Sequence, residues 1–414
     1  MNHRLTRYYY QRLKNYFWHL PLSIFYNLLY GFPQRKLILI GVTGTDGKTT
    51  TATLIHHTLI AAGIKSDFIT TINSPGLHTT SPNPSHLIPI FSKMVKAGIT
   101  HAVIETTAHG LDQFRFWGCH FQVGVLTNIT HEHFDDFIDL KHLTQAKSIL
   151  FHKSEIAVLN HDDPSYPHFK SLAHQKTISY SVTNKSDYQA KNIDISGSKL
   201  SFSVNNLDIT TNSNYYYQTY NILAALATTS SLNIKPQYLL DTIKHFPETK
   251  GRREIVSNDL NIDTIIDFAH TPQALQSTLE SLRQTSRGKI IVIFGATGGR
   301  DPTKRPLMGN IVSRLADIAI ITSDDTRNES IDHINQQIIA GIDKTTLTQK
   351  KFQYYNIPNR QDAFNLAIKL AHPQDTVIAC GKGHETTILH GSTEYPWSEA
   401  EAFRTAFHSK NQNV

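Results

Sequence analysis

Cysteine and long apolar runs are scarce in this 414-residue chain. Its two cysteines, Cys119 and Cys380, lie far apart and outside any C-x-x-C motif, so neither a disulfide framework nor a cysteine zinc site is expected. The longest apolar stretch, residues 20–32, is interrupted by proline, serine and asparagine, and a membrane-spanning helix needs about 18 apolar residues. We therefore expect a cytoplasmic protein without a transmembrane helix.

Acidic residues are absent from the first 40 positions, which hold six of the 40 basic and ten of the 40 aromatic side chains. The rest of the chain then carries 34 basic and 34 acidic residues, so the net charge of +6 belongs to the N-terminal segment. A neutral body offers no basic field for nucleic acid, and we predict no nucleic-acid partner.

The N-terminal leader, residues 1–35, has the spacing of an amphipathic helix. At 100° per residue, its apolar face carries Leu5, Tyr9, Leu13, Tyr16, Phe17 and Leu20. Arg4, Arg7 and Lys14 fall on another face, which is typical of helices that lie on anionic membranes. Two interpretations stay open: peripheral membrane contact through residues 1–32, or a helix packed against the protein body.

Two α/β blocks follow the leader, and we predict an α/β fold with two domains. The central domain, residues 36–247, is expected to hold a mostly parallel sheet, with buried strands near residues 37–43, 101–105, 123–127 and 157–160. Small antiparallel strands are expected over 176–212 and a helix over 220–232. The C-terminal domain, residues 248–414, shows a Rossmann-like alternation, with strands at 263–268, 289–294, 318–323 and 376–380 and helices at 271–284 and 361–371.

A glycine-rich loop joins the first strand of the central domain to a helix. Backbone N–H groups in such a loop cradle phosphates, the lysine reaches the terminal phosphates and the following threonine can bind Mg²⁺. The alternative is a structural turn with an exposed lysine. The predicted nucleotide-binding residues are Gly44, Thr45, Asp46, Gly47, Lys48, Thr49 and Thr50.

Nine motifs, in family order between residues 36 and 403, resemble those of the Mur ligase family, and the later ones resemble its MurE branch. They occupy residues 41–50, 104–111, 127–135, 145–151, 251–254, 267–272, 298–306, 323–327 and 381–385. The resemblance implies an ATP-dependent amide ligase of peptidoglycan synthesis. Such an enzyme adds an amino acid to a muramoyl-peptide carboxylate through an acyl phosphate, with two Mg²⁺ ions as cofactors.

The resemblance also implies the residues of the reaction centre. It assigns catalytic roles to Lys48, Glu105, His133, Lys147 and Arg252. Thr49 and Glu105 would hold the nucleotide Mg²⁺, and His133 and Lys147 the second ion, with Lys147 as a carbamate formed from CO₂. Asn128, Arg252, Asp267 and His270 would contact ATP. The alternatives are a structural His133 and a solvated Lys147.

Substrate contacts are implied in both domains. The acceptor side comprises Thr80, Ser81, Thr107, Gln113 and Arg115, and the amino-acid side comprises Arg300, Asp324, Asp325, Arg327, Gly381 and Glu385. Diaminopimelate-adding members carry D-N-P-R where this chain has Asp324-Asp325-Thr326-Arg327. The retained arginine favours diaminopimelate or another diamino acid, because a guanidinium can bind a carboxylate through two hydrogen bonds. The alternative is that Arg327 forms a surface ion pair with Glu329.

The family pattern has one large departure at the N-terminus. MurE-type ligases begin with a uridine-binding domain, whereas only about 35 residues precede the first strand here, too few for such a domain. We expect the acceptor site without the uridine anchor, in a monomer. Two other functions stay open: a sister ligase acting on a different carboxylate, as in polyglutamate synthesis, and a nucleotide-binding scaffold of cell-wall synthesis.

Overall fold

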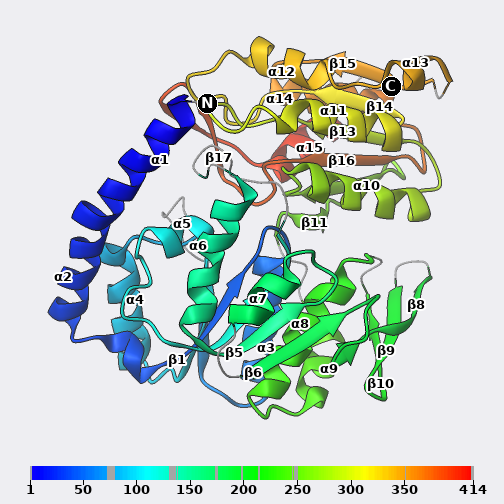
Figure 1. The fold of residues 1–414 in the computed structure, drawn as a ribbon. Coiled ribbons are helices and arrows are strands. Elements are labelled where there is room, and N and C mark those ends of the chain that lie inside the picture. Colours follow the sequence, from blue (N-terminus) through cyan, green and yellow to red (C-terminus); the bar gives the residue numbers. More distant parts are fainter. Residues whose placement is uncertain are drawn as a thin grey trace. The chain divides into compact units, whose positions relative to one another are not determined.

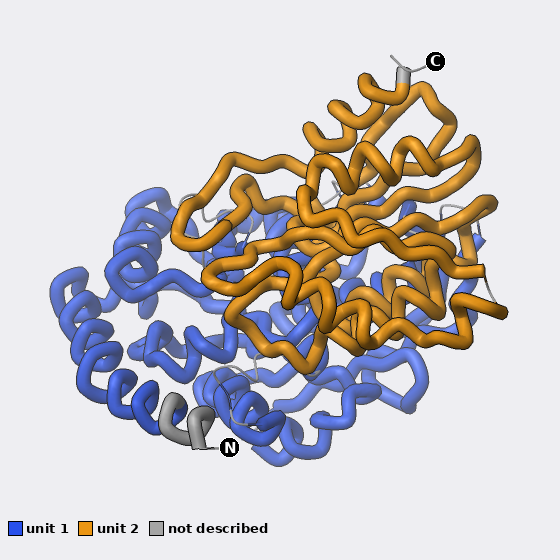
Figure 2. Tube along the Cα trace, turned by 90° about the horizontal axis from the view of Figure 1, so that it is seen from above, with its two compact units in different colours: residues 1–246 blue, residues 247–414 orange. Residues whose placement is uncertain are grey.

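The computed structural model describes residues 2–71, 80–129, 137, 139–172, 176–196, 199–212, 215–244, 246, 250–349 and 351–411. Its contacts divide the chain into two compact units, residues 1–246 and residues 247–414 (Figure 2). The predicted α/β class is confirmed in both units.

Unit 1 is built on a seven-stranded sheet in which every strand pair is parallel. The order β2-β3-β1-β4-β5-β6-β7 places β1 (Ile38–Thr43) between β3 (His101–Glu105) and β4 (Phe121–Leu126). The other strands are β2 (Ser66–Ile69), β5 (Ser154–Asn160), β6 (Lys176–Ser181) and β7 (Tyr188–Gln189). The predicted strands at 101–105, 123–127 and 157–160 are confirmed to within a few residues.

Helices cover both faces of this sheet (Figure 1). One core contains side chains of α4 (Pro84–Lys96), α5 (Ala108–Asp112), α6 (Leu140–His152) and α7 (Tyr166–Leu172). The other contains side chains of α3 (Lys48–Ala61), α8 (Gln218–Ser231) and α9 (Pro236–Lys244). Because the central strands are buried on both sides, they read as continuous apolar runs in the sequence.

The predicted antiparallel strands over 176–212 are only partly correct. β6 and β7 extend the parallel sheet, and only β8 (Lys191–Ser196), β9 (Lys199–Val204) and β10 (Leu207–Thr211) form a separate antiparallel sheet. The reason lies in β6, whose last four residues are all buried. The hydroxyl of Tyr180 donates to the carbonyl of Leu126 at 2.8 Å, which ties β6 to the main sheet.

Unit 2 contains a six-stranded sheet of order β11-β12-β16-β13-β14-β15, in which only β11 (Arg252–Ile255) is antiparallel. The parallel strands are β12 (Asp263–Asp267), β13 (Ile290–Phe294), β14 (Ile318–Ile321), β15 (Gln353–Asn356) and β16 (Thr376–Cys380). α10 (Pro272–Thr285), α11 (Lys304–Leu315) and α12 (Ile331–Ile339) pack on one face, and α14 (Arg360–Leu370) and α15 (Glu399–Asn411) on the other. A short helix α13 (Lys344–Gln349) and a hairpin of β17 (Thr387–His390) and β18 (Thr393–Pro396) complete the unit.

The leader is helical, as predicted. α1 (Asn2–Lys14) continues through a π-helical turn η1 (Asn15–His19) into α2 (Leu20–Tyr30), and a 3₁₀ turn η2 (Pro33–Lys36) leads to β1. The chain leaves α2 at Gly31, whose φ of +66° is one that glycine adopts without strain. Within the described ranges, no helix has the length and apolarity needed to cross a bilayer.

Candidate active site

Three loops of unit 1 meet because of the strand order. β3, β1 and β4 are neighbours and parallel, so the residues that follow them lie along one edge of the sheet. These residues are the glycine loop after β1, Glu105 at the end of β3, and Thr127 and Asn128 after β4. Open α/β sheets bind ligands at this edge.

The glycine loop is held in a conformation that two of its residues require. Gly44 has φ +147° and Gly47 has φ +81°. A Cβ at Gly44 would overlap Thr127 Oγ1, and a Cβ at Gly47 would overlap Asn221 Oδ1, so both positions are closed to a side chain. The loop therefore runs directly into α3 with Gly47 before its first residue.

Lys48 begins α3, and its Nζ donates to the carbonyl of Thr45 at 2.7 Å. The ammonium group thus lies over the loop and beside the N-terminal end of a 14-residue helix. Free backbone N–H groups and the helix dipole favour an anion at such a place. The structure therefore presents a cation and a helix N-terminus to the same region.

Thr49 and Glu105 form the clearest candidate for a metal ligand pair. The Thr49 hydroxyl donates to Glu105 Oε2 at 3.0 Å, and the backbone N–H and hydroxyl of Thr71 donate to the same oxygen at 3.2 and 3.3 Å. Glu105 is only 2% exposed. A hydroxyl and a carboxylate are oxygen ligands of the kind that Mg²⁺ prefers, so this pair fits the ion.

Asn128 fixes the opposite side of the glycine loop. Its carbonyl accepts from the Thr45 N–H and its Oδ1 accepts from the Asp46 N–H, both at 2.9 Å. The Thr127 hydroxyl donates to the carbonyl of Asp46 at 2.7 Å. Sequence reasoning missed a support behind them, Asn160, whose amide donates to the carbonyl of Thr127 at 2.8 Å. A polar residue directly after a predicted strand was the signal available.

Lys147 lies in α6 and is buried, with 1% exposure. The alternative of a solvated lysine on the helix surface is therefore excluded. His133, its predicted partner at the second metal ion, lies outside the described residues. Among the residues described, no three His, Cys, Asp or Glu side chains gather closely enough to form a metal site of their own.

The predicted acceptor residues form one connected network in unit 1. Ser81 Oγ donates to the carbonyl of Glu105 at 3.1 Å and accepts from the Thr107 N–H at 3.0 Å. Arg115 donates to the carbonyl of Ser81 and, at 2.6 Å, to Gln113 Oε1. Burial lowers the pKa of Arg115 to about 10. Thr80 joins the network through Thr71, with 2.9 Å between their hydroxyl oxygens.

In unit 2, Arg252 and Asp267 are paired across β11 and β12. Burial raises the pKa of Asp267, although the neighbouring Arg253 and Arg252 oppose the shift. The guanidinium of Arg252 lies 4.4 Å from the centre of the Phe268 ring, and its buried Nε has no hydrogen-bond partner within the described residues. His270 and His384 flank Phe268, with ring centres 4.6 and 5.0 Å from it. His384 was missed, and burial together with Arg252 lowers its pKa to about 4.

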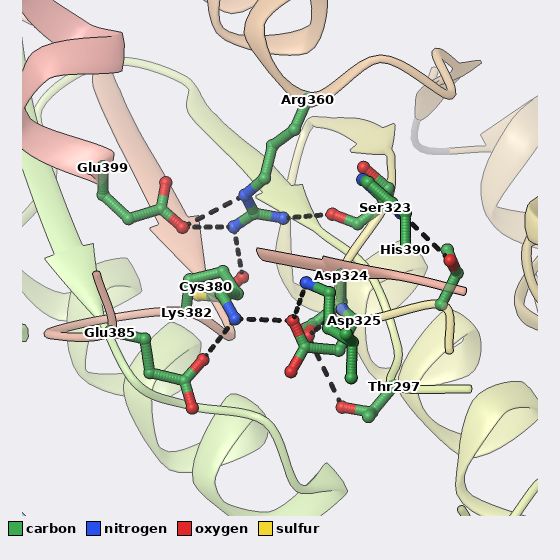
Figure 3. A network of polar contacts seen from close by, with 12 residues as sticks. Thr297, Ser323, Asp324, Asp325, Arg360, Cys380, Lys382, Glu385, His390 and Glu399 are labelled. Carbon is green, nitrogen blue, oxygen red and sulfur yellow. Dashed lines mark hydrogen bonds and ion pairs between the residues drawn. The ribbon is translucent and has the colours of Figure 1, made fainter. Parts of the chain in front are cut away.

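Asp324, Asp325 and Glu385 lie close together where β14 and β16 end (Figure 3). The buried ammonium of Lys382 binds Asp325 Oδ1 at 2.8 Å and Glu385 Oε2 at 2.5 Å. Asp325 Oδ1 also accepts from the Leu389 N–H at 2.9 Å. Gly381 has φ +114°, and a Cβ there would lie 2.8 Å from Asp324 Oδ2. Sequence reasoning missed Lys382, although it stands inside the quoted motif at 381–385.

The charges of this cluster are strongly coupled. Burial would raise the pKa of Asp324, but Lys382 and Arg360 outweigh it and the net shift is downward. Partial burial raises the pKa of Glu385 to about 7, although 38% of its side chain remains exposed. The nearby carboxylates raise the pKa of Lys382 against the effect of burial. The cluster therefore holds one fixed cation and a carboxyl group that titrates near neutral pH.

Arg360 supports the loops that follow β14 and β16, and no sequence motif indicated this role. It donates to the carbonyl of Ser323 at 2.8 Å and to the carbonyl of Cys380 at 3.1 Å, which are the residues just before Asp324 and Gly381. Its other partner is Glu399 at 2.6 Å, and the two side chains are 1% and 0% exposed (Figure 3). Two guanidinium nitrogens of Arg360 donate to the same oxygen, Glu399 Oε1, and this buried ion pair fixes the loops that Arg360 joins.

Arg327 does not pair with Glu329. Glu329 instead binds the fully buried Arg305, with N···O distances of 2.6 and 2.8 Å. The ion pair between Arg327 and Glu329 that the sequence allowed is therefore not formed. Arg327 has φ +52°, and its buried Nε lacks a hydrogen-bond partner in the described part of the chain. Arg300 lies in the turn after β13, next to Gly299, whose N–H donates to Glu329 Oε2 at 2.9 Å.

Comparison with known proteins identifies this arrangement. The family model described as the Mur ligase middle domain matches residues 42–229, and that of the Mur ligase, glutamate ligase domain matches residues 251–383. A protein of Geobacillus thermodenitrificans named UDP-N-acetylmuramoyl-L-alanyl-D-glutamate--2,6-diaminopimelate ligase is 33% identical over 405 residues, covering 93% of this chain and 82% of the relative. The chain belongs to the Mur ligase family. The predicted resemblance to this family and to its MurE branch is confirmed.

Other similar proteins agree with this placement. A Nostoc protein of the same name is 36% identical to this Mur ligase, covering 91% of the chain and 78% of the relative. A solved structure of a 2,6-diaminopimelate ligase has a TM-score of 0.62 at 27% identity and covers 91% of this chain and 79% of that one. The folylpolyglutamate synthase of Mycobacterium tuberculosis shares the fold, with a TM-score of 0.71 at 16% identity, covering 94% of this chain and 95% of that one. Mur ligases use ATP and Mg²⁺, which agrees with the Thr49–Glu105 pair.

Proposed function

We propose that this Mur ligase joins diaminopimelate to the terminal carboxylate of a muramoyl dipeptide in peptidoglycan synthesis. A carboxylate oxygen attacks the γ-phosphorus of ATP and releases ADP, and the resulting acyl phosphate loses phosphate when the amino group attacks and forms the amide. The relatives named for this reaction support the proposal. The observation that carries it is the hydrogen bond between Thr49 and Glu105 beside the glycine loop, because a Mg²⁺ ion there would neutralise the transferring phosphoryl group.

We assign the ATP phosphates to the glycine loop and to the first turn of α3. Lys48 supplies the cation, and Thr49 and Glu105 supply the Mg²⁺ ligands. Further nucleotide contacts are proposed for Asn128, Arg252, Asp267 and His270. Support for Arg252 comes from its buried Nε, which has no partner among the described residues.

The second Mg²⁺ ion is proposed to lie near Lys147 and His133, with Lys147 as a carbamate. Carbamylation replaces an ammonium by an anionic oxygen ligand and so removes the cost of burying a cation at this position. We expect ligase activity to fall when bicarbonate and CO₂ are removed from the buffer and to return when bicarbonate is added back. Activity of Lys147→Gln that responds to bicarbonate in the same way would contradict the assignment.

The amino-acid substrate is assigned to Arg327 and Glu385 in unit 2, together with Arg300 and Asp324. A diamino dicarboxylic acid needs a cation for its distal carboxylate and an anion for an ammonium group. Arg327 has a buried Nε without a hydrogen-bond partner among the described residues, and Glu385 has a partly exposed carboxylate. The acceptor peptide is assigned to the network of Ser81, Thr107 and Arg115, with Thr80 and Gln113.

ADP release by the full chain, with a panel of amino acids and muramoyl dipeptide, tests the proposal. We expect release with diaminopimelate, and a KM for diaminopimelate about tenfold higher or more in Arg327→Gln, because a charge-assisted contact is lost. The matched control is Arg287→Gln, an exposed arginine of the same unit. Use of lysine by the wild type that is as efficient as its use of diaminopimelate would contradict diaminopimelate as the substrate.

Two other outcomes would overturn the reaction itself. Release only with a polyglutamate-type acceptor would show a sister ligase, and nucleotide binding without release under any condition would show a scaffold. We also propose a monomeric enzyme, which sedimentation velocity would test.

A further inference from the structure

The leader helix is oriented in the opposite way from an ordinary surface helix. Such a helix buries its apolar stripe and exposes its polar one. Here the fully buried side chains of η1 and α2 are Asn15, Ser23 and Asn27, each at most 1% exposed. Most of the large apolar side chains described in the leader remain exposed, although Leu20 is half-buried and Tyr26 packs against the core.

Side-chain hydrogen bonds hold the leader in this orientation. Asn15 Nδ2 donates to Asp112 Oδ2 at 2.7 Å and to the carbonyl of Asp112 at 3.1 Å. Ser23 Oγ donates to the carbonyl of Phe114 at 2.7 Å, and Asn27 Nδ2 to the carbonyl of Trp117 at 3.3 Å. Turning the helix to bury its apolar side would leave these buried carbonyls without donors, which is costly. The packing interpretation of the leader is thus correct, but the packed face is the polar one.

The outward face is a large apolar surface. Of the 19 exposed large apolar side chains in the described residues, ten belong to the leader. The most exposed are Phe17 at 79%, Tyr10 and Leu28 at 66%, and Tyr9 at 63%, followed by Trp18 and Leu29 at 62%. Exposed apolar areas of this kind mark interaction surfaces.

The charge around this face indicates which partner covers it. Lys14, Arg35 and Lys36 are exposed, and the first 40 residues contain no acidic residue. Arg12 forms an ion pair with Asp112 at 3.2 Å. Within the described residues, Asp112 is the one carboxylate of the body that contacts the leader. Two copies meeting through this face would oppose like charges, whereas anionic lipid headgroups would attract them. Tyrosine and tryptophan are also the side chains that favour the membrane–water interface.

We propose that the leader is a peripheral docking surface for anionic lipid bilayers. Its aromatic and aliphatic side chains enter the headgroup region while its basic residues contact the lipid phosphates, and the buried Asn15, Ser23 and Asn27 keep the protein body attached. This inference concerns where the chain is held and does not depend on the reaction that it catalyses.

Vesicle flotation of the full chain tests the inference. Wild type should float with mixed vesicles of phosphatidylglycerol and phosphatidylcholine. Less of it should float with vesicles of phosphatidylcholine alone, or with the mixed vesicles at high salt. Phe17→Ser with Leu28→Ser should lower partitioning by about tenfold or more, because two apolar side chains leave the lipid. The matched control is Ile60→Ser with Leu347→Ser, two exposed apolar residues outside the leader, and it should float like wild type.

Trp18 gives a second readout that needs no large change in the surface. Its fluorescence should shift to the blue on anionic vesicles, and Trp18→Phe should still float while losing most of that shift. Failure of wild type to float, or equal loss in the control pair, would overturn the inference. So would a dimer without lipid that dissociates in Phe17→Ser with Leu28→Ser, because the face would then join two copies.

Discussion

Arg360→Met removes the cation from a buried ion pair and is the change whose cost is best defined by the structure. Arg360 and Glu399 are 1% and 0% exposed, Arg360 donates to Glu399 Oε1, and Glu399 Oε2 has no hydrogen-bond partner among the described residues. Removing one member of such a pair leaves an uncompensated buried charge, so we expect the free energy of unfolding of unit 2 to fall by about 3–5 kcal/mol. The carbonyls of Ser323 and Cys380 lose donors in the same change.

Glu399→Gln should cost less, about 1–3 kcal/mol, because the amide oxygen can still accept from Arg360 and the two carbonyl contacts remain. The double variant should cost less than the sum of the single changes by about 1–3 kcal/mol, since the two side chains interact directly. The exposed pair of Arg404 and Glu401 on the same helix is the control, and Arg404→Met should change stability by less than about 1 kcal/mol.

The stability that Arg360→Met loses should depend on pH in a definite direction. Burial raises the pKa of Glu399 and Arg360 opposes the shift, so removing Arg360 raises the pKa further. A carboxyl group whose pKa is raised in the folded state stabilises the fold when it is protonated, and this contribution disappears as the pH rises through the folded-state pKa. The cost of Arg360→Met should therefore be smaller at pH 5 than at pH 8.

Chemical denaturation of the full chain measures these values, with Trp397 as the probe. Trp397 is the only one of the three tryptophans in unit 2, and its ring centre lies 6.2 Å from that of Phe364 on α14. Fluorescence in a Trp18→Phe and Trp117→Phe background then reports on unit 2 separately from unit 1. A loss of unfolding free energy below about 1 kcal/mol for Arg360→Met, or additive effects of the two single changes, would show that the ion pair does not stabilise unit 2.

Three further predictions concern the site. Glu105→Gln should lower ligase activity by about 100-fold or more and weaken its Mg²⁺ dependence, because the carboxylate loses its charge. Mg²⁺ titration of ADP release measures both effects, and near-normal activity would exclude Glu105 as a Mg²⁺ ligand. Gly47→Ala should destabilise the fold more than Gly63→Ala, measured by thermal melting, because both have φ near +80° but only Gly47 faces Asn221, with open space at Gly63. The KM for the amino acid should rise as the pH falls below about 7, where Glu385 becomes protonated. Parallel assays of Glu385→Gln should show no such pH dependence, and a pH profile of KM equal to that of the wild type would exclude Glu385 from substrate binding.

Much of the fold and of the P-loop region could be predicted because their signals are local. Continuous apolar runs mark strands buried on both faces, and a glycine loop between such a strand and a helix marks a phosphate site. Because these strands are parallel neighbours, Thr49 and Glu105 come together although 56 positions separate them. The order of the strands, rather than any single motif, makes this contact.

Other features depend on pairings that no local pattern contains. Arg360 and Glu399 are 39 positions apart and lie on helices that only the packed unit brings together. β6 was expected among the small antiparallel strands, but it pairs in parallel with β5, and Tyr180 ties it to the main sheet. The spacing of the leader predicted the helix but not the packed residues Asn15, Ser23 and Asn27, because their contact depends on carbonyls of the body such as those of Phe114 and Trp117.

We propose above all that this Mur ligase forms an amide between diaminopimelate and a muramoyl dipeptide while it converts ATP to ADP and phosphate. The most direct test is mass spectrometry of the product formed by the full chain from ATP, Mg²⁺, diaminopimelate and muramoyl dipeptide, with Glu105→Gln as the inactive control. We predict a product heavier than the dipeptide by one diaminopimelate minus water, with one ADP released for each amide formed. ADP release without this product, or as much product from Glu105→Gln as from the wild type, would contradict amide formation at the proposed site.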